Sequence, residues 1–279
     1  MAWSTTGSDS KMDSPSSPRP ATFWNYLRER FSPIRWGPVA LFLGLACHAI
    51  QPFTSRNGAI LHLTFLFACI LQFRIWDDLA DLDLDRDKHP QRVLGRTSHQ
   101  LPYWITVLGV GLFTLAFLLA TEGDMRAATL YGSLLLLTFG IYRGLTNSRY
   151  RGLRNHLVLL KYPLLVAIFR HQALSAGNPR DWTLLGAVLL SFAIHEVLDD
   201  PELGLGSWSR VVYGLESALL LLLLGLLLPI SPPSPAWAIW GAFGVLAGKA
   251  LTRKGDFRSI FMASTSPFLL TATVLAVTL

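Results

Sequence analysis

The chain has 279 residues, of which 51% are hydrophobic and only 15% are charged. Soluble domains usually contain about a quarter charged residues, so this composition excludes an ordinary soluble globular protein. The formal net charge of +6 does not indicate nucleic-acid binding, because such an excess is typical of the cytoplasmic loops of membrane proteins. The two cysteines, Cys47 and Cys69, lie within apolar runs and show neither zinc-site spacing nor a disulfide framework.

The N-terminal segment differs from the rest of the chain. Its first twenty residues are rich in Ser and Pro, and we expect residues 1–30 to form a disordered cytoplasmic tail. The segment lacks the apolar h-region of a signal peptide, and the first apolar run begins only near Trp36. We expect residues 31–279 to form one transmembrane domain.

Beyond this tail, long apolar runs alternate with short polar breaks, which predicts an all-α, polytopic membrane protein with nine spanning helices. A helix needs roughly 17 to 25 mostly apolar residues to cross the hydrocarbon core of a bilayer. The predicted spans are residues 36–53, 58–76, 101–120, 126–145, 156–174, 182–198, 208–230, 235–252 and 259–279.

The distribution of Lys and Arg between these spans predicts an orientation. Eighteen of these residues fall on the side of the membrane that holds the N-terminus, and four fall on the other side. Because positive residues accumulate in cytoplasmic loops, the count predicts a cytoplasmic N-terminus and an external C-terminus. No transit peptide is evident, which favours a bacterial plasma membrane.

A dense group of aspartates follows the second predicted span, in the sequence WDDLADLDLDRD from Trp76 to Asp87. If the helix continues through this group, the first, second, third and fifth aspartates share one face, and Asp83 and Asp87 point away. Like charges at such spacings weaken a helix, and a bound Mg²⁺ would remove the conflict because it prefers oxygen ligands. The four aspartates on the shared face are Asp77, Asp78, Asp81 and Asp85. A solvated acidic loop is the alternative interpretation, and the EF-hand pattern of a calcium site is absent.

Two basic residues and a second acidic group are candidate partners of these aspartates. Arg92 follows Pro90, which is expected to end the helix, and its planar fork suits a phosphate. Lys161 lies inside a predicted span, where an ionisable group marks a functional candidate. For Arg92 the alternative is an ordinary positive-inside residue, and for Lys161 it is snorkelling to the membrane edge. Glu196 and Asp200 share a helical face at the end of the sixth predicted span, on the same side of the membrane, with a solvated loop as the alternative.

These motifs resemble the signatures of the UbiA superfamily of intramembrane prenyltransferases. The first signature of that family is written N-D-x-x-D-x-x-x-D with a downstream P-x-R, and it resembles the aspartate group with Pro90 and Arg92. The second is D-x-x-x-D, which Glu196 and Asp200 resemble. Asp77 stands in place of the usual Asn, Glu196 replaces the first Asp of the second signature, and Asp199 adds an acid. The resemblance covers residues 31–279 and implies a nine-helix bundle.

The resemblance also implies roles for individual residues. The implied Mg²⁺ ligands are Asp77, Asp78, Asp81, Asp85, Glu196, Asp199 and Asp200. The implied diphosphate-binding residues are Arg35, Arg92, Tyr142 and Lys161. Asp78, Asp81 and Lys161 are expected to be catalytic.

The expected activity is Mg²⁺-dependent ionisation of an allylic prenyl diphosphate, followed by transfer of the prenyl group to a small aromatic or lipid-like acceptor. The closest alternative is a membrane-bound terpene cyclase of the same superfamily, which captures the cation within the substrate. In both cases rings such as Phe73, Trp76, Tyr142 and Phe192 would stabilise the cation. A transporter or a non-catalytic cation-binding protein is a third interpretation, but we find no internal repeat and the acids lie at the membrane edge.

Overall fold

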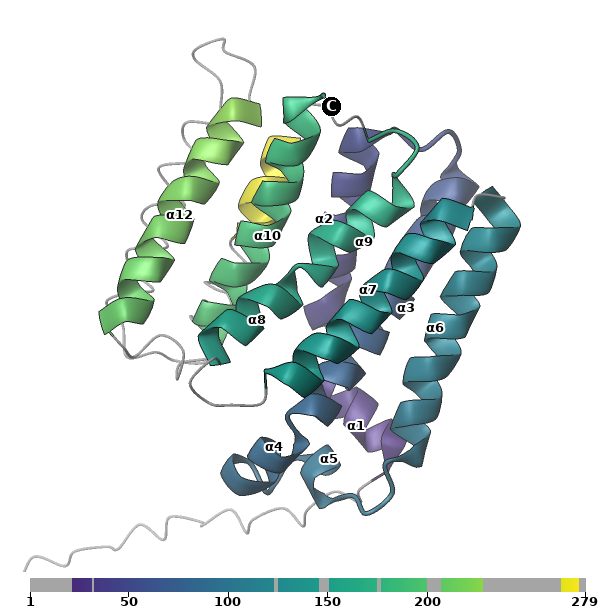
Figure 1. The fold of residues 1–279 in the computed structure, drawn as a ribbon, viewed down its shortest axis with the longest axis vertical. Helices are drawn as coiled ribbons and strands as arrows, with labels where there is room; N and C mark the ends of the chain where they lie inside the picture. Colours follow the sequence, from purple (N-terminus) through teal and green to yellow (C-terminus); the bar gives the residue numbers. More distant parts are fainter. Residues whose placement is uncertain are drawn as a thin grey trace, which may run out of the picture.

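The computed structural model describes residues 22–31, 33–122, 125–145, 151–174, 177–199, 207–227 and 267–275, and its elements are all helices (Figure 1). The expected all-α class is therefore confirmed for the described residues. The helices are α1 (Phe23–Arg30), α2 (Pro33–Ile50), α3 (Arg56–Ala80), α4 (Leu82–Lys88), α5 (Val93–Arg96), α6 (Leu101–Glu122), α7 (Met125–Gly144), α8 (Arg151–Leu159), α9 (Lys161–Phe169), α10 (Pro179–Asp199), α12 (Ser207–Leu227) and a helix at residues 267–275.

Three helices are long and apolar enough to cross a membrane: α3, the segment Leu101–Ala120 of α6, and α7. The 25 residues of α3 would extend about 37 Å at 1.5 Å per residue, more than the roughly 30 Å of a hydrocarbon core. Large apolar side chains of α6 and α7 are exposed, as expected for helices that face lipid. They include Ile105, Leu108, Leu112, Phe113, Leu130 and Leu136. The chain is thus a membrane protein by the length and composition of its helices.

The described helices match some of the nine predicted spans better than others. Two shorter apolar helices, Trp36–Ile50 and Val211–Leu227, fall within the first and seventh predicted spans, and α10 covers the sixth. Of the ninth, only residues 267–275 are described, and the eighth lies outside the described residues. The count of nine spans therefore stays a prediction.

The fifth predicted span, residues 156–174, is wrong as one continuous helix. It consists of the end of α8 and all of α9, with a break at Leu160 (Figure 1). Pro163 explains the break, because proline has no N–H to donate to the carbonyl of Leu159 and its ring crowds the preceding turn. The break makes Lys161 the first residue of a new helix.

The N-terminal tail that we expect to be disordered ends earlier than residue 30. Residues 23–30 form helix α1, whose N-terminus is capped when the Thr22 hydroxyl accepts a hydrogen bond from the backbone N–H of Asn25 at 3.3 Å. Tyr26 is only 1% exposed and packs edge-on against Tyr103 of α6, with ring centroids 5.0 Å apart. Residues 1–21 lie outside the described part of the chain.

A polar network in the middle of α3 positions this helix against α6 and α7. The amide nitrogen of Gln72 donates to the carbonyl of Val107 at 3.0 Å, and the amide oxygen accepts from the hydroxyl of Tyr131 at 2.5 Å. Gly111 permits the close approach, because a Cβ at that position would lie 2.8 Å from the Gln72 amide nitrogen. The network holds the end of α3, and with it the aspartates, in a fixed place relative to its neighbours.

Candidate active site

The helix that carries the aspartates bends at Asp81. Helix α3 ends at Ala80, and Asp81 takes φ −100° and ψ 11° before α4 begins at Leu82. The expected continuous helix is therefore wrong. Its hydrogen-bond spacing is nevertheless kept, since the Asp81 N–H donates to the Asp77 carbonyl at 3.0 Å and the Asp85 N–H donates to the Asp81 carbonyl at 2.9 Å. Helix α4 ends at Lys88, just ahead of Pro90, as expected.

This spacing separates the aspartates into two groups. Asp78 and Asp85 are buried and Asp77 and Asp81 are half-buried, whereas Asp83 and Asp87 are exposed. The prediction that Asp83 and Asp87 point away from the shared face is thus confirmed. The other four aspartates, which we call the aspartate cluster, each contact at least one cationic side chain.

Asp77 is paired with Lys161, the residue at the start of α9. The ammonium group lies 2.6 and 2.7 Å from the two carboxylate oxygens, and the lysine is only 1% exposed. The rings of Phe73 and Tyr162 lie 5.5 and 5.3 Å from the same nitrogen and add a cation–π contribution. Snorkelling to the membrane edge therefore does not describe Lys161, because its charge is buried against a carboxylate.

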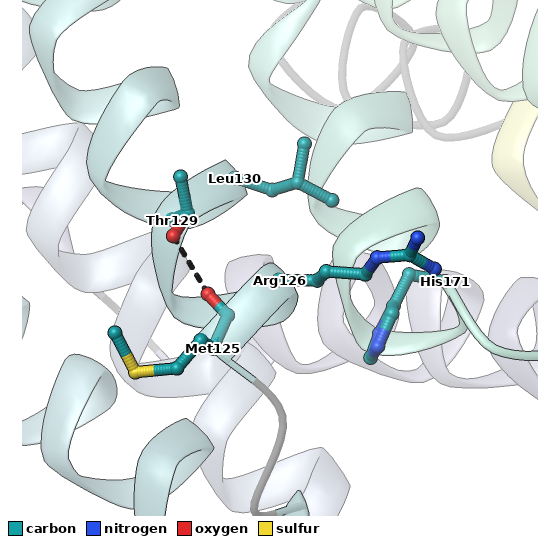
Figure 2. Close-up of a pocket in the computed structure, with 5 residues that line it drawn as sticks. All are labelled: Met125, Arg126, Thr129, Leu130 and His171. Carbon is teal, nitrogen blue, oxygen red and sulfur yellow. Dashed lines mark hydrogen bonds between the residues drawn. The ribbon is translucent and has the colours of Figure 1, made fainter.

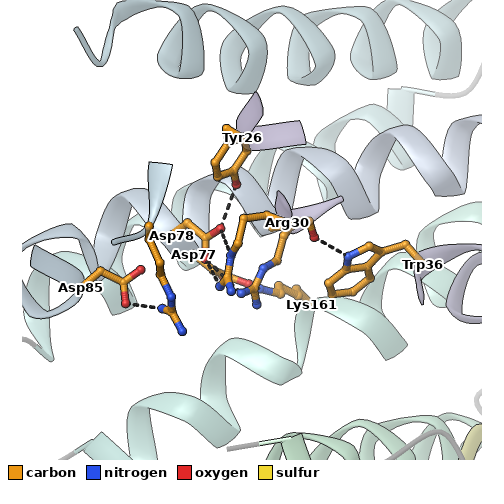
Figure 3. Close-up of polar contacts among 9 residues, drawn as sticks. Tyr26, Arg30, Trp36, Asp77, Asp78, Asp85 and Lys161 are labelled. Carbon is orange, nitrogen blue, oxygen red and sulfur yellow. Dashed lines mark hydrogen bonds and ion pairs between the residues drawn. The ribbon is translucent and has the colours of Figure 1, made fainter. Parts of the chain in front are cut away.

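Asp78 receives hydrogen bonds from two residues of helix α1 (Figure 3). Arg30 of α1 donates to both carboxylate oxygens, at 3.0 and 2.8 Å, and the Tyr26 hydroxyl donates to one of them at 2.8 Å. Arg74, one turn earlier on α3, adds an ion pair at 3.0 Å. The Trp36 indole N–H donates to the backbone carbonyl of Arg30 at 2.9 Å and so holds the arginine in place.

The environment of Asp78 also affects the pKa of the Tyr26 hydroxyl. Burial of the phenol, followed by the negative charge of Asp78, raises the pKa of Tyr26 well above its ordinary value of 10.0. The hydroxyl therefore stays protonated and donates its hydrogen bond throughout the neutral range.

Asp81 and Asp85 are paired with arginines from two further segments. Arg154 of α8 lies 2.6 Å from an oxygen of Asp81, and Arg92 of the turn before α5 lies 2.5 Å from an oxygen of Asp85. Asp81 is the more accessible, because 39% of its side chain is exposed against 10% for Asp85. Cations from α1, α3, α8, α9 and the α4–α5 turn thus meet at one end of the long helices.

The donor chemistry of the cluster fits Mg²⁺, which prefers carboxylate oxygens. Among the described residues, no three His, Cys, Asp or Glu side chains come together to hold a metal ion. Mg²⁺ usually takes one or two protein carboxylates and completes its coordination with water and substrate phosphates. Two buried donors near the cluster, the Nε of Arg74 and the hydroxyl of Tyr142, have no hydrogen-bond partner in the described part of the chain. Each of these donors can hydrogen-bond to an acceptor oxygen.

The second acidic group is described only in part. Glu196 is half-buried on α10, and its charge acts electrostatically on Asp77 and Arg74 of α3. The structure therefore brings Glu196 toward the aspartate cluster. The side chains of Arg35 and Asp199, and all of Asp200, lie outside the described residues, so their roles stay predictions.

Three of the implied diphosphate-binding residues lie at or near the aspartate cluster. Arg92 and Lys161 contact the cluster directly, and the ring of Tyr142 lies 6.0 Å from that of Trp76, the neighbour of Asp77. Away from these residues, Glu216 of α12 is paired with His156 of α8 at 2.6 Å.

Sequence reasoning missed four residues of the site: Tyr26, Arg30, Arg74 and Arg154. Arg74 carried a usable signal, since it is ionisable within an apolar run, as Lys161 is. In the sequence, Arg154 is one of many basic residues predicted to lie in cytoplasmic loops. Tyr26 and Arg30 lie within the N-terminal tail that was expected to be disordered. These three gave no local signal, because their carboxylate partners lie 48 to 73 residues away in the sequence.

The structure also contains a groove of about 430 Å³ at the opposite end of α7 (Figure 2). It is lined by Met125, Arg126, Thr129, Leu130 and His171. Helix α7 begins at Met125, and its other end carries Tyr142 beside Trp76. The groove is therefore distant from the aspartate cluster and contains none of the predicted site residues.

Comparison of the chain with models of known protein families, with curated proteins and with solved structures finds no match. The resemblance to the UbiA superfamily therefore depends on the residues of the two signatures and stays a prediction.

Proposed function

We propose that this protein catalyses the Mg²⁺-dependent ionisation of an allylic prenyl diphosphate at the membrane and transfers the prenyl group to a small aromatic or lipid-like acceptor. One observation carries the proposal: four carboxylates and five cations gather at one end of membrane-length helices. Carboxylates suit the metal, and the cations suit the diphosphate. The apolar helices provide an environment for an isoprenoid chain.

The roles of the residues follow from their positions. Asp77, Asp78, Asp81 and Asp85 would bind Mg²⁺ ions, with one or two carboxylates to each ion, and the bound metal stabilises the negative charge that develops on the leaving diphosphate. Lys161, Arg92 and Arg154 would turn from their carboxylates toward the diphosphate oxygens and stabilise the same charge. Because Lys161 is buried, its positive charge acts in a medium of low dielectric constant, where electrostatic stabilisation is stronger than in water.

A group of aromatic rings next to Lys161 would shelter the organic cation. Tyr162 stacks on Phe192 with centroids 3.6 Å apart, and Phe192 contacts Phe268 at 4.8 Å and Phe42 at 6.1 Å. Ring faces attract cations and exclude the water that would quench an allylic cation. The same shelter would also serve the second candidate function, cyclisation of the prenyl diphosphate without an acceptor.

Product analysis tests the proposal and separates the two functions. Purified protein would be incubated with farnesyl and geranylgeranyl diphosphates in the presence of Mg²⁺, with diphosphate release and organic products measured. Release that requires an added acceptor supports the transferase, and a cyclic hydrocarbon without acceptor supports the cyclase. No release with either substrate would refute both functions, and release by an Asp78→Ala, Asp81→Ala double variant at the wild-type rate would refute the catalytic assignment of these aspartates.

We further propose that the chain adopts a nine-helix bundle of UbiA type, with the N-terminus and the aspartate cluster on the cytoplasmic side of a bacterial plasma membrane. The meeting of Arg30, Arg92 and Arg154 at one end of the helices supports this, because the charge count assigned all three to one side. Labelling of single cysteines introduced at Arg86 and at Arg180 tests it. Labelling of both residues from the same side of the membrane would contradict the proposal.

A further inference from the structure

Four donor contacts occupy the carboxylate of Asp78, and three of them come from helix α1. An ionised carboxylate offers about four lone-pair sites. Arg30 takes two of them, one on each oxygen, Tyr26 takes a third and Arg74 takes the fourth. No other member of the aspartate cluster is as fully engaged, since Asp81 and Asp85 each receive one arginine in the described residues. Asp78 therefore cannot accept a metal ion while all of these donors remain in place.

We propose that α1 is a clamp that competes with Mg²⁺ for Asp78 and releases this carboxylate when Mg²⁺ and a diphosphate bind. The inference rests on the proposed function and adds a means of regulating the same site. Three of the four donor contacts to Asp78 come from α1, so the movement of this single helix frees most of the carboxylate.

The attachment of α1 suits a segment that is held and then released. The helix has eight residues, and Tyr26 is its one buried side chain, whereas Trp24, Arg28 and Glu29 are exposed. Beyond Asp78, it is held by a few contacts: the Trp36 hydrogen bond to the Arg30 carbonyl, Glu29, which accepts from the Val93 N–H at 3.2 Å, and the packing of Phe23 and Tyr26 against the ring of Tyr103. An isolated helix shorter than about 12 residues is marginal in water, so loss of its contacts would also loosen its backbone.

The charges of Asp78 and Arg30 favour an exchange of binding partners over the simple loss of their ion pair. When the carboxylate of Asp78 turns to a metal ion, the guanidinium of Arg30 loses its partner, and a diphosphate offers it new acceptor oxygens. Mg²⁺ and the diphosphate therefore stabilise the released state together, whereas Mg²⁺ alone has to displace Arg30 without compensation. We expect Mg²⁺ and pyrophosphate to release α1 together more effectively than Mg²⁺ does by itself.

Hydrogen–deuterium exchange of the full-length protein in detergent tests the clamp directly. The expected result is faster exchange of the backbone amides of residues 25–31 when Mg²⁺ and inorganic pyrophosphate are added, with a smaller increase for Mg²⁺ alone. Binding would be measured in parallel by isothermal titration calorimetry with the same two ligands.

Variants of α1 give a second measurement. Tyr26→Phe keeps the buried ring and removes its hydrogen bond to Asp78, and Arg30→Gln removes the charge. Each should lower the Mg²⁺ concentration needed for half-maximal Mg²⁺ binding in the absence of pyrophosphate, by about tenfold for Arg30→Gln, as expected for loss of a charge-assisted contact that competes with the metal. Arg28→Gln is the matched control, since this arginine is exposed on the same helix and should change nothing.

The outcomes separate the clamp from the proposed function. Pyrophosphate binding that leaves the exchange of residues 25–31 unchanged, or equal Mg²⁺ requirements in wild type and both variants, would overturn the clamp and leave the proposed function standing. Absence of Mg²⁺-dependent pyrophosphate binding in wild type and in every variant would overturn the proposed function and the clamp together. If one α1 variant fails to fold, the other variant and the wild-type exchange experiment still decide the question.

Discussion

Helix α3 carries a neutral polar residue, Gln72, and five residues later a pair of ionic residues, Asp77 and Asp78. Gln72 is neutral, and its amide is hydrogen-bonded to the Val107 carbonyl and to the Tyr131 hydroxyl. Asp77 and Asp78 are ionic and face Lys161, Arg30 and Arg74. Both groups are satisfied by their partners, and yet only the second has partners that a ligand can replace.

The difference indicates how one helix can be both a support and part of a site. A neutral hydrogen-bond network in an apolar interior gains nothing from an ionic ligand, so it fixes the helix packing. Ion pairs can exchange partners, because a metal ion replaces the cation on one side and a diphosphate replaces the carboxylate on the other. The following predictions test this division of roles.

The largest effect is expected where a buried ion pair is broken. Lys161→Met leaves the carboxylate of Asp77 without its cation, and removal of one partner of a buried pair costs about 3 to 5 kcal/mol. Diphosphate release should fall by about 100-fold or more, as for loss of one charge-stabilising donor. Thermal unfolding in detergent and a diphosphate-release assay measure the two effects.

The double variant Asp77→Asn, Lys161→Met is the control for Lys161→Met. It removes both charges, so most of the lost stability should return while activity stays low. Recovery of activity in the double variant would show that the pair has only a structural role.

A smaller effect is expected in the neutral network. Gln72→Leu leaves the Val107 carbonyl and the Tyr131 hydroxyl without their partner, which costs about 1 to 3 kcal/mol of unfolding free energy. Because the network only supports the helix, diphosphate release per folded molecule should stay close to wild type. A loss of activity as large as that of Lys161→Met would contradict the division between the two groups.

Two glycines of α6 give a matched test of the close packing at Gln72. In Gly111→Ala the new Cβ would meet the Gln72 amide nitrogen, so this end of a flexible side chain has to shift and weaken its bond to Val107, at a cost of about 1 kcal/mol. Gly109→Ala meets nothing within 4 Å and should stabilise the helix by up to about 1 kcal/mol. Equal changes in melting temperature for the two variants would refute the packing argument.

The smallest effect concerns the pH dependence of the Tyr26 contact. Because the pKa of Tyr26 is raised in the folded protein, its contribution to stability is complete below pH 10 and decreases as the pH rises above that value. The difference in unfolding free energy between wild type and Tyr26→Phe, about 1 kcal/mol, should be constant from pH 7 to 9 and shrink above pH 10. A difference that already changes between pH 7 and 9 would contradict the assigned environment of Tyr26.

The sequence alone determined the features that depend on neighbouring residues. The length of the apolar runs predicted membrane-length helices such as α3 and α7, because a hydrophobic helix needs a certain number of residues to cross a bilayer. The spacing of the aspartates predicted which of them share a face, because a helix repeats every 3.6 residues whatever it packs against. Pro90 marked the end of α4 for an equally local reason.

Only the tertiary structure decided which cation meets which carboxylate. Tyr26 and Arg30 reach Asp78 from 52 and 48 residues away, and Arg154 reaches Asp81 from 73 residues away. No local pattern specifies such partners, because any of the many basic residues of the chain has the correct charge. The packing of α1 and α8 against the end of α3 selects among them, and this selection turns a row of aspartates into a set of ion pairs.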